Sequence, residues 1–199
     1  MSVRGVLLIK GTPSETEAWV RRGVVAAHVV PAGAWVGICP AESQTRVPEP
    51  YDAVVPALAG HPLRRNQRPG IGFFVTRDDS GERGLLTLQS GRVRPTTAWL
   101  AWTPRRGTHT LPPLPAPSIA DLAAAVGRPG ARGRVLDALR AQRAGVDEWL
   151  TGVMLALDLP AVDLILGAPR AVPVTEPEEK SVQTFASLTA DDLREEQTR

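Results

Sequence analysis

Cys39 and His28 are the two side chains that come closest to a nucleophile and base pair. An imidazole can remove the proton of a nearby thiol, and the resulting thiolate attacks carbonyl carbon. Both residues lie in a predicted hairpin that spans Val24–Cys39. With residues 31–33 as a three-residue loop, His28 faces Val36, so the alternation of side chains places His28 and Cys39 on opposite faces. A register changed by one residue would reverse this, but we expect Cys39 to be buried and unreactive.

Metal and phosphate sites are not predicted by the remaining motifs. His28, His61 and His109 lie on three different expected elements, and none has a second histidine three or four residues away. The Gly70–Gly72 segment lacks the third glycine of a dinucleotide fingerprint, and it enters a strand rather than a helix. Two glutamates follow the glycine-containing turn at residues 11–14, where a phosphate would have to bind. We therefore assign no catalytic residue, metal ligand or cofactor.

Arginine is concentrated in one part of the chain. Residues 61–110 contain 9 basic and 3 acidic side chains. Such a surface can bind nucleic-acid phosphates without sequence preference. Single-strand binders also need aromatic platforms, whereas Trp99 and Trp102 are spaced to face opposite sides of a strand. We favour a solvated arginine face, or one that docks the acidic tail. The candidate anion-binding residues are Arg64, Arg65, Arg68, Arg92 and Arg94.

A second candidate surface lies in the acidic C-terminal segment. Residues 171–199 contain 3 basic and 7 acidic side chains, and apolar residues recur among them at helical spacing. An apolar stripe in a polar tail can fold on a protein partner. The alternative is an unstructured terminus without a role. The candidate partner-binding residues are Val182, Phe185, Leu188 and Leu193.

These residues must be positioned by a sheet whose nucleus we expect between Gly70 and Thr103. Two β-rich runs joined by a polar turn at 77–82 predict a hairpin, and a third run follows. Upstream, the apolar residues 6–9 predict a buried strand, and a capping box at Ser14–Glu17 predicts a helix. The order β-α-β-β-α-β with extra strands resembles a ferredoxin-like module. We predict an α+β fold with an N-terminal mixed sheet module.

The composition changes after this module, and four parts are predicted. Residues 1–104 form the sheet module, and residues 105–117 form a proline-rich connector. A helical module follows at 118–167, where Ser118 caps one helix and a long apolar periodicity is hinged near Gly145. Residues 168–199 are predicted to be an acidic, largely disordered tail.

Composition also limits the class of protein. A single cysteine excludes an intramolecular disulfide, and 21 arginines against 2 lysines indicate the codon usage of a GC-rich bacterial genome. The apolar run at residues 6–9 is too short for a signal peptide or a membrane span, so we expect a cytoplasmic protein without membrane contact.

The function that these features favour is that of a non-enzymatic adaptor or regulatory protein. It would bind a protein partner through the helical module and the tail. One alternative is a nucleic-acid-associated regulatory factor that uses the arginine-rich face at residues 61–106. Another is an enzyme whose site is assembled from loops that sequence spacing does not reveal.

Overall fold

The fold is α+β, built on one large sheet. The computed structural model describes residues 2–79, 81–91, 96–143, 145–168 and 171–197, with residues 189–197 described by their backbone. The named strands pair in the order β7-β6-β5-β4-β1-β3-β2-β8, and every pairing between them is antiparallel. They are β1 (Ser2–Ile9), β2 (Ala27–Ala32), β3 (Trp35–Pro40), β4 (Gly70–Asp78), β5 (Gly81–Ser90), β6 (Thr96–Thr103), β7 (Gly107–Thr110) and β8 (Val174–Thr175).

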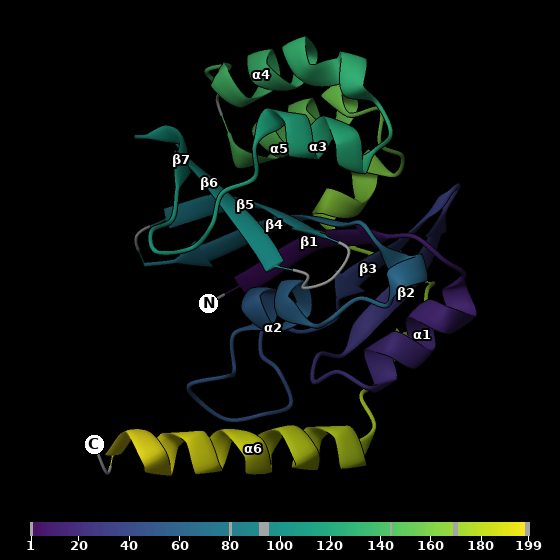
Figure 1. The fold of residues 1–199 in the computed structure, drawn as a ribbon, viewed down its shortest axis with the longest axis vertical. Helices are drawn as coiled ribbons and strands as arrows, with labels where there is room; N and C mark the ends of the chain where they lie inside the picture. The colour runs from purple at the N-terminus through teal and green to yellow at the C-terminus, as the bar shows by residue number, and fades with distance from the viewer. Residues whose placement is uncertain (1, 80, 92–95, 144, 169–170, 198–199) are drawn as a thin grey trace.

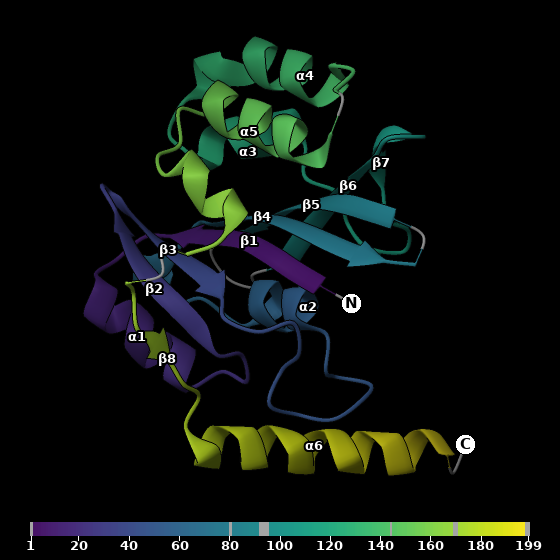
Figure 2. The same cartoon turned by 180° about the vertical axis from the view of Figure 1, so that it is seen from behind.

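Helices cover both faces of this sheet (Figure 1). The α-helices are α1 (Pro13–Arg21), α2 (Val54–Gly60), α3 (Ile119–Ala125), α4 (Arg132–Arg140), α5 (Val146–Ala156) and α6 (Glu179–Gln197). Short 3-10 turns are η1 (Arg65–Gln67), η2 (Pro129–Ala131) and η3 (Val162–Leu166). Helices α3, α4 and α5 lie on one face, whereas α1 and α2 lie on the other, and α6 runs beyond α2 (Figures 1 and 2). Among the described residues, no helix combines the length and apolar composition that crossing a bilayer requires.

Two apolar cores result from this arrangement, one on each face. Adjacent residues of β4 separate between them: Phe73 belongs to the core under α5, and Phe74 to the core under α1 and α2. Trp99 and Trp102 of β6 separate in the same way, as the spacing predicts. The continuous apolar run of β1 is buried throughout residues 6–9 because both faces of this strand are covered.

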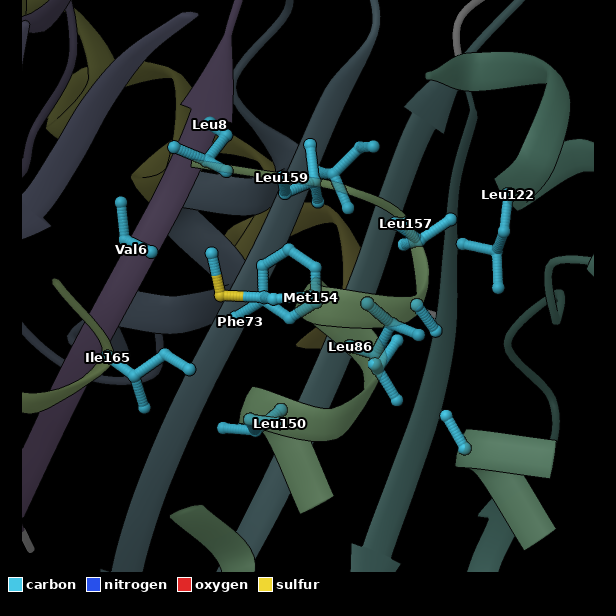
Figure 3. Close-up of a cluster of buried hydrophobic side chains, with 14 of the residues drawn as sticks. Val6, Leu8, Phe73, Leu86, Leu122, Leu150, Met154, Leu157, Leu159 and Ile165 are labelled. Carbon is cyan, nitrogen blue, oxygen red and sulfur yellow. The ribbon is translucent and has the colours of Figure 1, made fainter. Parts of the chain in front are cut away.

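The sheet and the helical module share the first of these cores. Phe73 and Leu86 of the sheet pack among Leu150 and Met154 of α5, as the close-up in Figure 3 shows. All four side chains are fully buried. Since each contributes apolar surface to one cluster, we expect the two layers to stabilise each other.

Several sequence predictions need correction. Every named pairing of the sheet is antiparallel, so the N-terminal module is mixed in combining helices with strands and not in strand direction. Helix α1 begins earlier than predicted, because Thr12 rather than Ser14 caps it. Thr12 and Glu15 form reciprocal hydrogen bonds, and Pro13 occupies the first helical position. Part of the predicted connector forms β7, and part of the predicted disordered tail forms β8 and α6. The division of residues 1–199 into four parts stays a prediction.

Candidate functional site

Helix α6 is attached at its N-terminal end to the rest of the protein, the sheet with its covering helices, which we call the body. Strand β8 precedes it and pairs with β2, where Ala27 faces Thr175. The backbone NH of Glu178 donates to the carbonyl oxygen of Arg21 at 2.7 Å. Arg46 forms an ion pair with Glu176 at 2.8 Å. These contacts fix the direction in which α6 leaves the sheet.

One face of α6 turns toward the body. Val182 and Ala186 are partly buried against the core on the α2 side of the sheet. The Phe185 ring meets the Tyr51 ring edge to face, with 5.8 Å between the ring centroids. Leu188 follows on this face and is 62% exposed. The structure thus brings together three of the four predicted partner-binding residues, whereas the side chain of Leu193 lies outside the described residues.

Between this face of α6 and the body lies a groove with a volume of about 700 Å³. Its walls are largely apolar, and this volume is typical of sites that bind a ligand or an inserted side chain. The body contributes Tyr51, Pro56 and His61, and α6 contributes Lys180, Phe185 and Leu188. We call this feature the α6 groove.

The body wall of the α6 groove is held in place by a buried glutamine. Gln89 of β5 is 3% exposed. Its side-chain oxygen accepts from the NH of Leu63 at 2.9 Å, and its nitrogen donates to the carbonyl oxygens of Ala59 and His61, each at 3.1 Å. A buried amide with all these partners fixes the segment after α2 relative to the sheet. Pro56 is accepted in α2 because it lies in the first turn.

His61 is uncharged at neutral pH in this setting. Burial lowers its pKa from 6.5 to about 4, and the nearby positive charge of Arg22 acts in the same direction. The imidazole contacts the Trp19 ring, with 4.5 Å between the ring centroids. The His61 side chain therefore adds no charge to the groove, whose charged lining residues are Arg22 and Lys180.

The depressed pKa of His61 makes stability depend on pH. The unfolded chain binds a proton at this residue below pH 6.5, whereas the folded protein does not until about pH 4. The contribution is therefore present above pH 6.5 and is lost as the pH falls toward 4, by at most about 1.4 kcal/mol per pH unit. We expect His61→Gln to lose less stability than the wild type between pH 7 and pH 4.5. Urea unfolding at both pH values measures this, and parallel losses in the two proteins would contradict it.

The positions of Cys39 and His28 differ from the sequence prediction. Ala32 pairs with Trp35, so a two-residue turn with Gly33 at φ +66° replaces the predicted three-residue loop. His28 consequently pairs directly with Cys39, and the two side chains share one face of the sheet rather than opposite faces.

This proximity does not activate the thiol. Cys39 is fully buried, and burial raises its pKa to about 12, so the thiol stays protonated at neutral pH. The Nδ1 atom of His28 shares a hydrogen bond with the carbonyl oxygen of Val172, at 2.8 Å. Cys39 is therefore a buried core residue, as expected.

The structure describes three of the five predicted anion-binding arginines. Arg64 precedes η1 and Arg65 begins it, and both residues are exposed. Arg68 is partly buried and donates to the carbonyl oxygens of Leu63 and Gly91, at 3.1 and 2.7 Å. Its role is to hold the loop against the sheet. Two further candidates, Arg92 and Arg94, lie outside the described residues.

The sequence did not point to the body wall of the α6 groove. The residues that line the whole groove come from segments 22–24, 50–62 and 180–188, which are far apart in the chain, and the first two segments form the body wall. Tyr51, Pro56 and His61 form no local pattern, so only the fold reveals that they share a surface with Phe185.

No metal centre is found within the described ranges, where no three histidine, cysteine or acidic side chains are placed to hold an ion together. Comparison of the chain with protein-family models, curated proteins and solved structures finds no match.

Proposed function

We propose that this chain is a non-enzymatic cytoplasmic interaction protein that holds an amphipathic helix of a protein partner in the α6 groove. The observation that supports this most is the groove itself, an apolar channel of about 700 Å³ beside the exposed Leu188. Helix-in-groove recognition uses such a surface, in which side chains at helical spacing enter an apolar channel.

The length and charge of α6 support a helical occupant. Its 19 residues span about 28 Å at 1.5 Å per residue, which is enough to lie along several turns of a partner helix. The sequence of α6 contains five acidic residues, Glu179, Asp191, Asp192, Glu195 and Glu196, against two basic ones, Lys180 and Arg194. Four of these acids lie at residues 191–196, beyond the part of α6 that lines the groove, whereas Arg22 and Lys180 line the groove itself. We therefore expect the occupant to be basic where it passes residues 191–196, since complementary charge steers association.

The helical module contributes a separate exposed surface. Leu155 of α5 and Leu166 of η3 are 58% and 68% exposed. They belong to the layer on the opposite side of the sheet from α6 (Figures 1 and 2). A partner helix in the α6 groove would not reach them, so the proposal places partner binding at the tail, and Leu155 provides a matched control.

Quantitative co-purification of two variants tests this proposal. We expect Leu188→Asp to remove a partner that the wild type retains, because a carboxylate in an apolar groove loses its hydration. Leu155→Asp introduces the same charge on an equally exposed leucine and should leave that partner bound. Both positions are exposed, so both variants should fold. Identical sets of co-purifying proteins for the two variants would contradict the proposal.

We also propose that residues 2–78 form a ferredoxin-like unit to which the other elements are added. The order β1-α1-β2-β3-α2-β4 supports this, as does the strand order β4-β1-β3-β2 within the sheet. Strands β5, β6 and β7 then extend the sheet beyond β4, and β8 extends it beyond β2.

A further inference from the structure

A second cavity, of about 640 Å³, lies on the helical side of the sheet, away from the α6 groove. The turn between β6 and β7 forms one wall, and the end of α4 with the following loop forms the other. The Thr108 hydroxyl joins the walls by donating to the carbonyl oxygen of Leu139 at 2.5 Å. Trp102 lines the floor and is stacked on Trp149, with 6.2 Å between the ring centroids. The walls are thus fixed relative to each other.

Four arginines line this cavity, and the guanidinium group of one of them, Arg143, extends to 3.3 Å from the Cβ position of Gly152 in α5. Arg105 and Arg106 come from the β6–β7 turn, and Arg140 and Arg143 come from the opposite wall. We call this feature the four-arginine cleft. All four residues are exposed, and its described lining contains no acidic side chain.

These four arginines are not neutralised within the described part of the chain. None of them has a side-chain hydrogen bond or an ion pair there. Some arginines elsewhere are paired, as Arg4 is with Asp147 at 2.6 Å and Arg134 is with Asp158 at 3.0 Å. Four like charges around one cavity repel each other, so an anion that enters it gains from all four.

The end of α4 does not cancel this attraction. The last carbonyl groups of a helix have partial negative charge, which would repel an anion. Here the Leu139 carbonyl accepts from Thr108, and the Asp137 carbonyl accepts from the NH of Ala141 at 2.9 Å. The partial charge at a helix end is about half a unit, which is small beside the four full positive charges of the arginines.

We propose that the four-arginine cleft binds a small ligand with a chain of two or three linked phosphates. A planar guanidinium donates two parallel hydrogen bonds to a phosphate, and four of them on two walls match several linked phosphates better than one. Trp102 is 2% exposed and offers no face on which a nucleic-acid base can stack. The cleft therefore fits a compact polyphosphate better than a nucleic-acid strand.

Isothermal titration calorimetry of the full chain with inorganic triphosphate, at low salt, tests the proposal. We expect saturable 1:1 binding by the wild type. Arg140→Gln/Arg143→Gln and Arg105→Gln/Arg106→Gln alter opposite walls, and each should weaken binding roughly ten-fold or more, since hydrogen bonds to charged groups are lost. The matched control is Arg64→Gln/Arg65→Gln, which removes two exposed arginines elsewhere and should bind triphosphate as the wild type does.

Three outcomes would overturn the proposal. The first is no binding of triphosphate by the wild type, and the second is an equal loss of affinity in the control and in the two cleft variants. The third is a wild type that does not bind triphosphate but binds a single-stranded oligonucleotide, as measured by fluorescence anisotropy. That third result would assign the arginines to a nucleic-acid backbone instead.

Discussion

Replacing Gly5 with alanine is expected to destabilise the folded protein severely. Gly5 lies in β1 with φ at +132°, a conformation that residues with a side chain rarely adopt. A Cβ atom there would be 2.1 Å from the carbonyl oxygen of Phe73 and 2.7 Å from the Cα atom of Phe74. Both are backbone atoms of β4, so relief requires breaking the central β1–β4 pairing. We expect a loss of about 4 kcal/mol or more, against a typical stability of 5–15 kcal/mol.

Gly33→Ala is the matched control for this prediction. Gly33 also has a positive φ, at +66°, but nothing lies within 4 Å of the position of its Cβ atom. Only the cost of the left-handed conformation applies, about 1–2 kcal/mol. Urea unfolding followed by tryptophan fluorescence measures both variants. Equal losses in the two would show that the close approach of β1 and β4 at Gly5 is not as described.

Phe73→Ala is expected to destabilise the whole protein in one unfolding transition. Phe73 is fully buried between the sheet and α5, among residues that include Met154 and Leu150 (Figure 3). Removing a buried phenylalanine ring costs about 3–5 kcal/mol through lost burial and the cavity that remains. Because the two layers share this core, thermal unfolding should remain a single transition at a lower temperature.

The control for this second prediction is Phe185→Ala in α6. Phe185 is 36% exposed and contacts Tyr51 at the edge of the structure, so its loss should cost roughly 1–2 kcal/mol. Two separate transitions in Phe73→Ala, with only one displaced from the wild-type temperature, would mean that the helices of residues 118–167 fold as an independent domain.

Local patterns in the sequence predicted a hairpin, the alternation of side chains along a strand and a helix cap. The β4–β5 hairpin followed from two apolar runs around a polar turn, and the separation of Trp99 from Trp102 followed from strand alternation. Ser118 caps α3 as predicted, because its side chain and that of Asp121 satisfy backbone groups of the first turn. In each case a few neighbouring residues suffice to set the conformation.

The errors arose where one residue decides between two local solutions. Gly33 can occupy a two-residue or a three-residue turn. The prediction assumed the longer turn, and it therefore placed His28 on the opposite face of the sheet from Cys39. Thr12 and Ser14 both precede a glutamate by three residues, and Pro13 makes Thr12 the better cap because proline suits the first helical position.

The sequence indicated one wall of each surface proposed for binding and did not indicate the other. The α6 groove depends on where β8 directs α6, and its two walls come from opposite ends of the chain. The four-arginine cleft joins Arg105 and Arg106 to Arg140 and Arg143, which are more than thirty residues away. Arg105 and Arg106 belong to the arginine-rich face at residues 61–106 that the sequence indicated, whereas Arg68 of the same face donates to backbone carbonyl groups.

Photo-cross-linking at position 188 tests the central claim most directly. Leu188 would be replaced by the photoreactive residue benzoylphenylalanine, and Leu155 would be replaced in the same way as the control, in cells that express the full chain. We predict a cross-link from position 188 to an apolar residue on a helix of a single partner protein, absent from position 155 and lost when Phe185→Asp is added. No protein cross-linked at position 188, or the same proteins cross-linked at both positions, would contradict a partner-binding role for the α6 groove.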